Sequence, residues 1–230
     1  MYKRIWVYGQ PFSGKTTFAT ASADHYVLST DGNAQYSTNS YKVITDEVTV
    51  NGRITQRKLA WDVLKDEIAK LETGSDYKTI IVDLVEDTYE MARIFMYNKL
   101  GITHESDDSF RAWDKVRVEY LSTMRRLLNL PYDIILLSHE DTSKDITKKS
   151  GENITAIKPN ITDKVANKLA GMVALVGRAV CDNNEYQLQI KTDEVTFGGG
   201  RLGINNLTIP LDWSKVTELF ESRVPNTAKQ

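Results

Sequence analysis

The sequence predicts an α/β fold in which helices cover both faces of a mostly parallel sheet. Three apolar runs, at 5–8, 78–83 and 133–138, have the length and continuous hydrophobicity of buried parallel strands. Segments with helical periodicity separate these runs, and a glycine-rich loop follows the first of them. A chain of 230 residues with 41% hydrophobic content is long enough to bury one such core.

The glycine-rich loop is the most specific motif in the chain. Gly9-Gln10-Pro11-Phe12-Ser13-Gly14-Lys15-Thr16 fits the pattern G-x-x-x-x-G-K-[ST] at every fixed position. In this pattern the backbone N–H groups enclose phosphates, the lysine reaches the β- and γ-phosphates, and the hydroxyl of the last residue binds Mg²⁺. The sequence therefore predicts a three-layer P-loop NTPase in which Gly9 to Thr16, together with Thr17, bind a nucleotide.

The first half of the chain continues this alternation of strands and helices. A helix begins near Gly14, and a second strand at 26–30 ends at Asp31-Gly32. Short β-rich runs follow, and Asn51-Gly52 is a strong hairpin signal. We expect the further elements to be β-runs at 41–44, 47–50 and 53–56, a helix at 59–71, the strand at 78–83 and a helix at 88–100.

The second half changes character after the strand at 133–138. The segment 141–160 is polar, lacks apolar periodicity and is long for a connection, which predicts a mobile functional loop. Two strands around Asn183-Asn184 predict a late antiparallel hairpin. The other expected elements are helices at 110–129, 162–169 and 214–222, strands at 173–176 and 186–190, and a flexible loop at 198–200. We predict one domain over 1–213, followed by a helix and a disordered tail over 214–230.

Carboxylates at strand ends supply the candidates for metal binding and hydrolysis. Asp83 ends an apolar strand, so we expect it to hold Mg²⁺ beside Thr16, directly or through water. Leu84 follows it, so a hydrolytic base must come from elsewhere. Asp31 is the first candidate for that base, although an Asp-Gly pair is also a common turn, and Glu86 is the second candidate.

Other polar residues are predicted to complete the site. His139 ends the strand at 133–138, from where a neutral imidazole would donate to the γ-phosphate and report its presence to the following loop. Glu140 is a candidate for positioning metal or water. Arg201 follows three glycines and is a candidate arginine finger for a neighbouring subunit, with Lys191 as its companion; plain surface charge is the alternative for both.

Net charge, cysteine content and the length of apolar runs indicate the partners and the cellular environment of the protein. The formal net charge is -2, so nucleic-acid binding would require a local basic patch. One cysteine, Cys181, suits a reducing cytoplasm. No apolar run approaches the ~20 residues of a membrane span, and the N-terminus leads directly into the first strand, so we expect neither a membrane anchor nor a signal peptide.

The order of these parts resembles the RecA-like ATPase core. The phosphate loop, a carboxylate at Asp31, a strand ending in Asp83, a strand ending in Ser138-His139-Glu140 and a late hairpin occur in that order. More narrowly, the chain resembles the phage-encoded, core-only RecA-like proteins that act as single-strand annealing recombinases. It differs from RecA itself at three positions: Asp31 replaces the usual Glu, His139 replaces the usual Gln, and Leu84 replaces a small residue.

This resemblance implies an ATPase that uses ATP and Mg²⁺ and acts on single-stranded DNA in phage recombination, by annealing or strand exchange. It also implies a homo-oligomer, ring or filament, with nucleotide between subunits, located in the host cytoplasm. A single-stranded DNA-binding protein is a further partner that it admits. The candidate DNA-binding residues are the lysines of the 141–160 loop: Lys144, Lys148, Lys149 and Lys158.

Two other functions remain open. A P-loop kinase acting on a small metabolite or nucleotide would need a lid with several arginines, and 141–160 contains none. An ATP-gated DNA clamp or loader that hardly hydrolyses ATP is compatible with aspartate at position 31.

Overall fold

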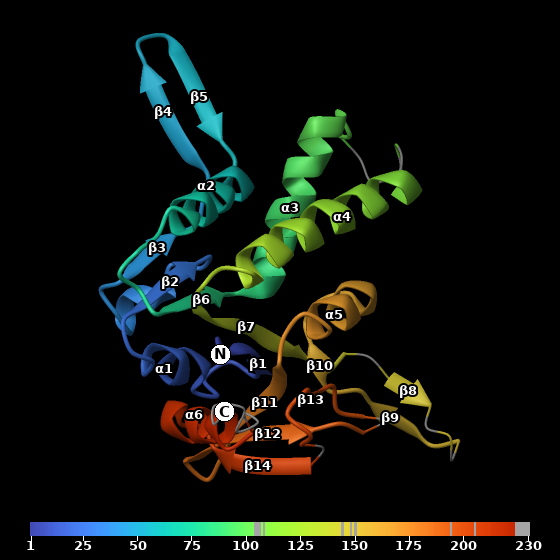
Figure 1. Ribbon diagram of the computed structural model, residues 1–230. Coiled ribbons are helices and arrows are strands. Elements are labelled where there is room, and N and C mark those ends of the chain that lie inside the picture. Colours follow the sequence, from blue (N-terminus) through green and yellow to red (C-terminus); the bar gives the residue numbers. More distant parts are fainter. Residues whose placement is uncertain are drawn as a thin grey trace, which may run out of the picture.

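The computed structural model has the predicted α/β architecture (Figure 1). It describes residues 1–103, 107, 109–143, 145–147, 149, 151–193, 195–204 and 206–223. A central sheet has parallel strands in its middle and antiparallel strands at one side. Its path in space is β14 (Asn206–Pro210), β12 (Glu185–Lys191), β11 (Leu175–Asp182), β1 (Arg4–Gly9), β7 (Asp133–Asp141), β6 (Thr79–Asp83), β2 (His25–Ser29) and β3 (Tyr41–Val43).

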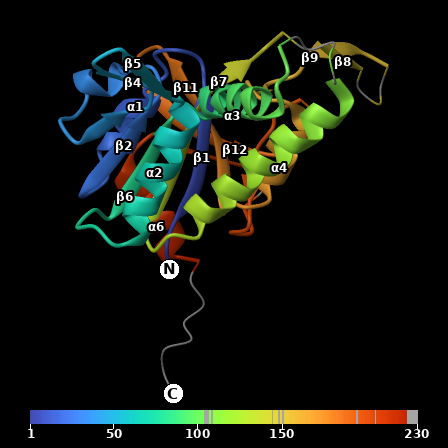
Figure 2. The same cartoon turned by 90° about the horizontal axis from the view of Figure 1, so that it is seen from above.

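Helices cover both faces of the sheet, because side chains of its central strands are apolar in both directions. In β1, Trp6 and Tyr8 pack on one face while Ile5 and Val7 pack on the other, and all four are fully buried. The first face carries α2 (Ala60–Glu72), α3 (Val85–Leu100), α4 (Ser109–Leu128) and α5 (Asp163–Ala170), and the second carries α1 (Lys15–Thr20) and α6 (Trp213–Glu221). Figure 2 shows α2, α3 and α4 lying on one side of these strands.

The parallel strands bring their carboxyl ends to one edge of the sheet. Gly9 of β1 is the register neighbour of His139 in β7, and Asp83 of β6 is the neighbour of Leu137 in β7 and of Ser29 in β2. Ligands of such sheets bind outside this carboxyl edge. The predicted phosphate loop, metal-binding carboxylate and strand-end histidine therefore lie at the same edge.

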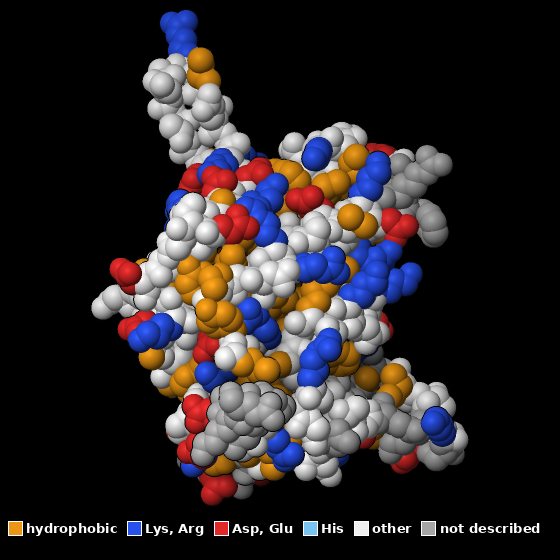
Figure 3. Space-filling view, viewed as in Figure 1, with side chains coloured by type: hydrophobic (Ala, Val, Ile, Leu, Met, Phe, Trp, Pro, Cys, Tyr) orange, Lys and Arg blue, Asp and Glu red, His pale blue; other side chains and the backbone are white. Residues whose placement is uncertain are grey.

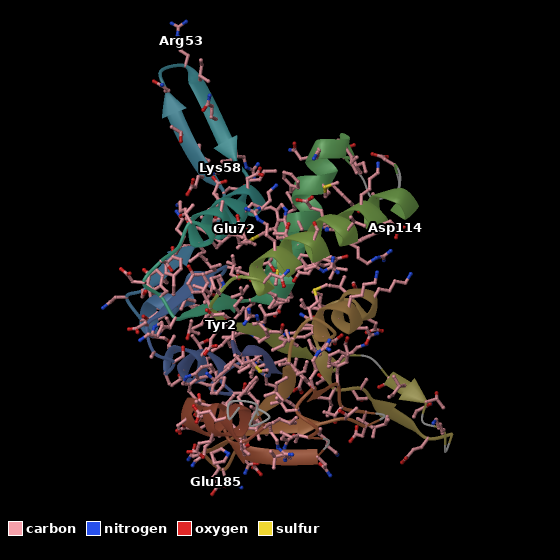
Figure 4. All side chains as sticks on the ribbon, viewed as in Figure 1. Tyr2, Arg53, Lys58, Glu72, Asp114 and Glu185 are labelled. Carbon is pink, nitrogen blue, oxygen red and sulfur yellow. The ribbon has the colours of Figure 1, made fainter. Side chains whose placement is uncertain are left out.

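Two hairpins project from the body. The predicted hairpin around Asn51-Gly52 is present as β4 (Glu47–Asn51) and β5 (Ile54–Lys58). Figure 3 shows it standing clear of the rest of the molecule, and Figure 4 places Arg53 at its tip. The second hairpin, β8 (Asp145–Thr147) and β9 (Asn153–Thr155), arises from the segment expected to be a loop.

The fold differs from the expectation in its shortest strands. The segment 141–160 also contains β10 (Lys158–Pro159), which pairs with the end of β7. Strands of two or three residues are too short to show alternation in a sequence. Gly199 and Gly200 form β13, which pairs with β11, instead of a free loop. A Cβ on Gly200 would lie 2.5 Å from the Ala174 carbonyl oxygen, so this glycine permits a close backbone approach.

Two further findings concern the ends of the fold. Strand β14 has no counterpart among the predicted elements, whereas α6 lies within one residue of the predicted helix and buries Val216 and Phe220 in the core. The expected tail at 224–230 is outside the described residues. Among the described helices, none combines the length and hydropathy required to cross a bilayer.

Candidate nucleotide-binding site

The phosphate loop connects β1 to α1 and depends on both of its glycines. A Cβ on Gly9 would lie 2.3 Å from the carbonyl oxygen of Ala179, so only glycine fits against β11 there. Gly14 has φ 83°, in the left-handed region that favours glycine. Phe12, by contrast, has φ 64° with its side chain 96% exposed. The loop is therefore fixed at its two glycines and presents its middle residues to solvent.

Lys15 lies inside the loop. Its Nζ donates to the carbonyl oxygens of Gly9 at 2.9 Å and Gln10 at 2.8 Å, and the side chain is buried. Burial lowers the pKa of Lys15, while the nearby carboxylate of Asp83 opposes that shift. The ammonium group is thus held where the motif requires a cation for phosphate.

Thr16 and Asp83, the two residues predicted to bind Mg²⁺, are in direct contact. The Thr16 hydroxyl donates to Asp83 Oδ2 at 2.9 Å. Burial is the main cause that raises the pKa of Asp83 to about 6, and the hydrogen bond from Thr16 works against it. Among the described residues, no three or more His, Cys, Asp or Glu side chains are arranged so that they could hold a metal ion by themselves. One hydroxyl and one carboxylate suit Mg²⁺, which usually keeps several waters and takes its other ligands from the substrate phosphates.

Glu86 and His139 form a direct pair beside this site. Glu86 Oε1 accepts from the His139 backbone N–H at 2.8 Å and lies 2.9 Å from His139 Nδ1. Burial raises the pKa of Glu86 to about 7. The pKa of His139 is lowered, first by burial and then by the charge of Lys15. The sequence predicted a function for each residue, but it gave no sign that they are in contact.

Glu140 is held by an arginine that sequence reasoning missed. Arg178, on β11, donates from Nε to Glu140 Oε2 at 2.6 Å and from Nη2 to Oε1 at 2.9 Å. The Glu140 side chain is 1% exposed, so this fork-shaped pairing satisfies a buried carboxylate. Both residues line a pocket of about 150 Å³ beside the loop segment Gln10–Ser13. The sequence offered one sign of this function: Arg178 follows the apolar run at 173–176 by two residues. Strand β11 continues beyond that run and includes Arg178.

Asp31 lies at the same edge but forms a turn. Its Oδ1 accepts from the backbone N–H of Asn33 at 2.9 Å, and its Oδ2 accepts from the Asn33 side-chain amide at 2.7 Å. The residue is exposed. This is the Asx-turn arrangement that was the alternative interpretation of Asp31-Gly32.

Arg201 lies at the opposite edge of the sheet from the phosphate loop of its own chain. Its backbone N–H donates to the Ala174 carbonyl at 2.8 Å, and its guanidinium contacts the carbonyl oxygens of Gly171 and Val173. The reason is that β13 runs antiparallel to the start of β11, which returns the chain to the amino edge. Lys191 forms an ion pair with Asp193 at 2.7 Å. A function of Arg201 in the site of a neighbouring subunit stays a prediction.

The lysines of the 141–160 segment are described only in part. Lys144 and Lys148 lie outside the described residues, and Lys149 is exposed. Lys158 forms an ion pair with Asp163 at the start of α5. The end of this segment is tied to the nucleotide site, because the Asn160 backbone N–H donates to the His139 carbonyl at 2.9 Å.

The sheet topology, the phosphate loop and the Thr16–Asp83 pair together define a P-loop NTPase fold. The model of a protein family described as an AAA domain matches residues 1–202. The chain belongs to this family, and membership indicates nucleotide binding and points to ATPase activity. No curated protein matches the sequence.

Proposed function

We propose that the protein binds Mg²⁺-ATP, hydrolyses it, and acts on single-stranded DNA as a RecA-like recombination protein. The observation that carries the nucleotide part is the convergence of three side chains at one sheet edge. Lys15 is buried within the phosphate loop, and the Thr16 hydroxyl meets the Asp83 carboxylate at 2.9 Å. When bound, Mg²⁺ supplies a positive charge that neutralises the phosphates.

Support for DNA binding comes from the connection between this site and the β8–β9 hairpin. Strand β7 carries His139 and continues to Asp141, and the hairpin follows directly. The lysines at 144, 148 and 149 belong to this segment. Asp141, Asp145 and Glu152 offset much of this charge, so the positive excess of the segment is small. A lysine-bearing segment that starts at a nucleotide site can still bind a phosphate backbone in a nucleotide-dependent way. We also propose that the protein acts as an oligomer.

A second candidate is an ATP-gated DNA clamp that hydrolyses ATP very slowly. The observation that favours it is the Asx turn of Asp31, whose two carboxylate oxygens both accept hydrogen bonds from Asn33. A carboxylate engaged in this way is a weak candidate for activating water.

The deciding experiment measures ATP hydrolysis with and without single-stranded DNA, together with the mass of the protein in solution. We expect turnover that DNA stimulates, an assembly larger than a monomer, and at least a hundredfold weaker ATP binding in Lys15→Ala because a charge-assisted contact worth about 3 kcal/mol is lost. ATP binding without turnover would favour the clamp. Unchanged ATP binding in Lys15→Ala would contradict the nucleotide site itself.

The DNA part has its own test. A triple variant with Lys144, Lys148 and Lys149 changed to alanine should bind single-stranded DNA more weakly. The slope of the logarithm of its binding constant against the logarithm of salt concentration should be shallower by about 2, because each phosphate contact contributes about 0.7 to this slope for single strands. The matched control changes Lys58, Lys78 and Lys215, which form exposed ion pairs elsewhere, and so has the same net charge. Equal affinities of both triple variants would exclude the loop from DNA binding.

A further inference from the structure

The contact between Glu86 and His139 fixes the orientation of an imidazole at the nucleotide site. One carboxylate oxygen, Glu86 Oε1, takes both the backbone N–H of His139 at 2.8 Å and its ring Nδ1 at 2.9 Å. The Glu86 side chain is 12% exposed and that of His139 is 36% exposed. The carboxylate therefore lies behind the ring, and the ring lies at the surface of the site.

The pair adjoins the phosphate loop. His139 is the register neighbour of Gly9, and Glu86 lies in the first turn of α3, three residues after Asp83. The charged groups that face His139 come from several elements: Lys15 of the loop, Asp83 of β6, Asp87 of α3 and Asp31 after β2. Burial and Lys15 both disfavour the imidazolium, so His139 is neutral at rest.

The hydrogen bonds also decide which ring nitrogen can accept a proton. Glu86 Oε1 accepts from the backbone N–H, so a neutral ring donates its Nδ1–H to the same oxygen. The lone pair then lies on Nε2. In the part of the chain that the structure describes, no group forms a hydrogen bond with His139 Nε2. A ring in this state accepts a proton, whereas the predicted γ-phosphate sensor would have to donate one.

The other candidate bases at this edge are already engaged. The two oxygens of Asp31 accept from Asn33, and the buried carboxylate of Glu140 is paired with Arg178. We propose that Glu86 and His139 form a carboxylate–imidazole dyad in which His139 Nε2 is the general base for ATP hydrolysis and Glu86 is its positioning residue. This inference rests on the proposed function.

In the proposed step, water attacks the terminal phosphorus of ATP while His139 removes its proton. His139 Nε2 takes one proton from the attacking water, whose oxygen forms a bond to the terminal phosphorus. The bond from that phosphorus to the bridging oxygen breaks, and its electron pair stays on the β-phosphate oxygen. The resulting imidazolium is balanced by the Glu86 carboxylate, as in other carboxylate–imidazole pairs. His139 then returns the proton to solvent.

The dyad predicts a defined pH dependence. Below about pH 7 Glu86 becomes protonated, because burial raises its pKa to about 7. A protonated Glu86 donates to Nδ1, which moves the ring hydrogen to Nε2 and removes the acceptor. The turnover number should therefore rise with pH through about 7 and then level off.

The test compares His139→Gln and Glu86→Gln with the unchanged protein. Glutamine at 139 can form hydrogen bonds but cannot accept a proton, so kcat should fall about 100-fold with little change in ATP affinity. Glutamine at 86 keeps an acceptor oxygen but loses the charge, so kcat should fall about tenfold or more while KM is kept. In both variants the rise of kcat through pH 7 should disappear. His25→Gln is the matched control, because both ring nitrogens of His25 are bonded to Ser22 and Thr38, away from this pair.

A spectroscopic readout tests the positioning function without turnover. The chain has three histidines, so nitrogen NMR of the imidazoles can assign His139 by its loss in His139→Gln. We expect the Nδ1–H tautomer in the unchanged protein and a shift toward the Nε2–H tautomer in Glu86→Ala.

The outcomes separate the two proposals. Turnover by the unchanged protein together with normal kcat and an unchanged pH profile in His139→Gln would overturn the dyad alone. An unchanged tautomer in Glu86→Ala would overturn the positioning function of Glu86. ATP binding without any turnover in the unchanged protein would overturn hydrolysis, and the base with it.

Discussion

The two edges of the central sheet differ in the partners that their charged side chains have. At the amino edge, Arg4 donates to the carbonyl oxygens of Leu128, Leu130 and Tyr132. Burial disfavours the charged form at both edges, because it lowers the pKa of Arg4 and Lys15 and raises the pKa of Asp83 and Glu86. At the carboxyl edge, however, neither Asp83 nor Glu86 forms an ion pair with a lysine or arginine among the described residues; they bond to Thr16 and His139. At the amino edge, Lys3 and Arg4 form hydrogen bonds and an ion pair within the chain itself. Charges at the carboxyl edge are kept at a cost to stability, which is the expected signature of a ligand site.

The amino edge shows what a satisfied charge looks like in this chain. Lys3 binds Asp133 twice, through its backbone N–H at 2.7 Å and its Nζ at 3.0 Å. Arg4 joins the end of α4 to the sheet, because Leu128 is the last residue of that helix. A cation at a helix C-terminus is also favoured by the helix dipole. These contacts involve only the chain itself, so we assign them to stability.

The largest expected effect on stability tests that assignment. Arg4→Ala leaves three partly buried carbonyl groups, at the end of α4 and in the connection from α4 to β7, without their Arg4 donor, so the free energy of unfolding should fall by about 3 kcal/mol. Urea denaturation measures this change, and calorimetric titration should find ATP affinity unchanged in the folded variant. The unfolding free energy of Arg4→Lys, which keeps the charge and one donor group, should lie between those of the unchanged protein and Arg4→Ala. If Arg4→Ala lost ATP affinity but kept its stability, the assignment of the amino-edge charges to stability alone would be contradicted.

A smaller effect of opposite sign is expected at the carboxyl edge. Because the pKa of Asp83 is raised to about 6, the folded protein holds a proton that the unfolded chain releases near pH 4. The unfolding free energy of the nucleotide-free protein therefore falls as pH rises from about 4 through 6. Asp83→Asn cannot titrate, so at pH 7.5 it should be more stable than the unchanged protein by on the order of 2 kcal/mol.

Denaturation in EDTA at pH 4 and pH 7.5 measures this difference, which should vanish at the lower pH. The same variant should lose the Mg²⁺ dependence of ATP binding. A variant that is less stable at pH 7.5 would mean that the Asp83 carboxylate supports the fold, as the charges of the amino edge do.

The sequence predicted the parts of this contrast that depend on local pattern. The run Thr79–Asp83 is a buried strand that ends in a carboxylate, and the phosphate loop fits its motif at each fixed position. A continuous apolar strand and the spacing of glycines in a loop involve residues that are close together in the chain, so both can be recognised from the sequence alone. The order of apolar runs also predicted the parallel sheet and the helices on both faces.

Long-range pairing could not be predicted in the same way. Arg201 was predicted to reach the phosphate of a neighbouring subunit, and this stays a prediction. The edge of its own sheet at which Arg201 lies is determined by the antiparallel pairing of β13 with β11, which the sequence did not indicate. The contacts Glu86–His139 and Glu140–Arg178 join residues 53 and 38 positions apart. No periodicity in the sequence encodes which carboxylate meets which base, because side-chain pairing follows from the order of strands in the sheet.

The smallest expected effect concerns Asp31, which belongs to the carboxyl edge by position but resembles the amino edge in its bonding. Its exposed carboxylate caps a turn through Asn33, so Asp31→Ala should remove only a surface turn contact and lower the unfolding free energy by less than about 1 kcal/mol. If His139 is the base, kcat of this variant should fall less than about threefold, whereas the loss of a true general base costs about 100-fold or more. Steady-state ATP hydrolysis by Asp31→Ala and Asp31→Asn decides between these values. A large loss in both variants, with normal stability, would return the base to Asp31 and leave His139 as the phosphate sensor.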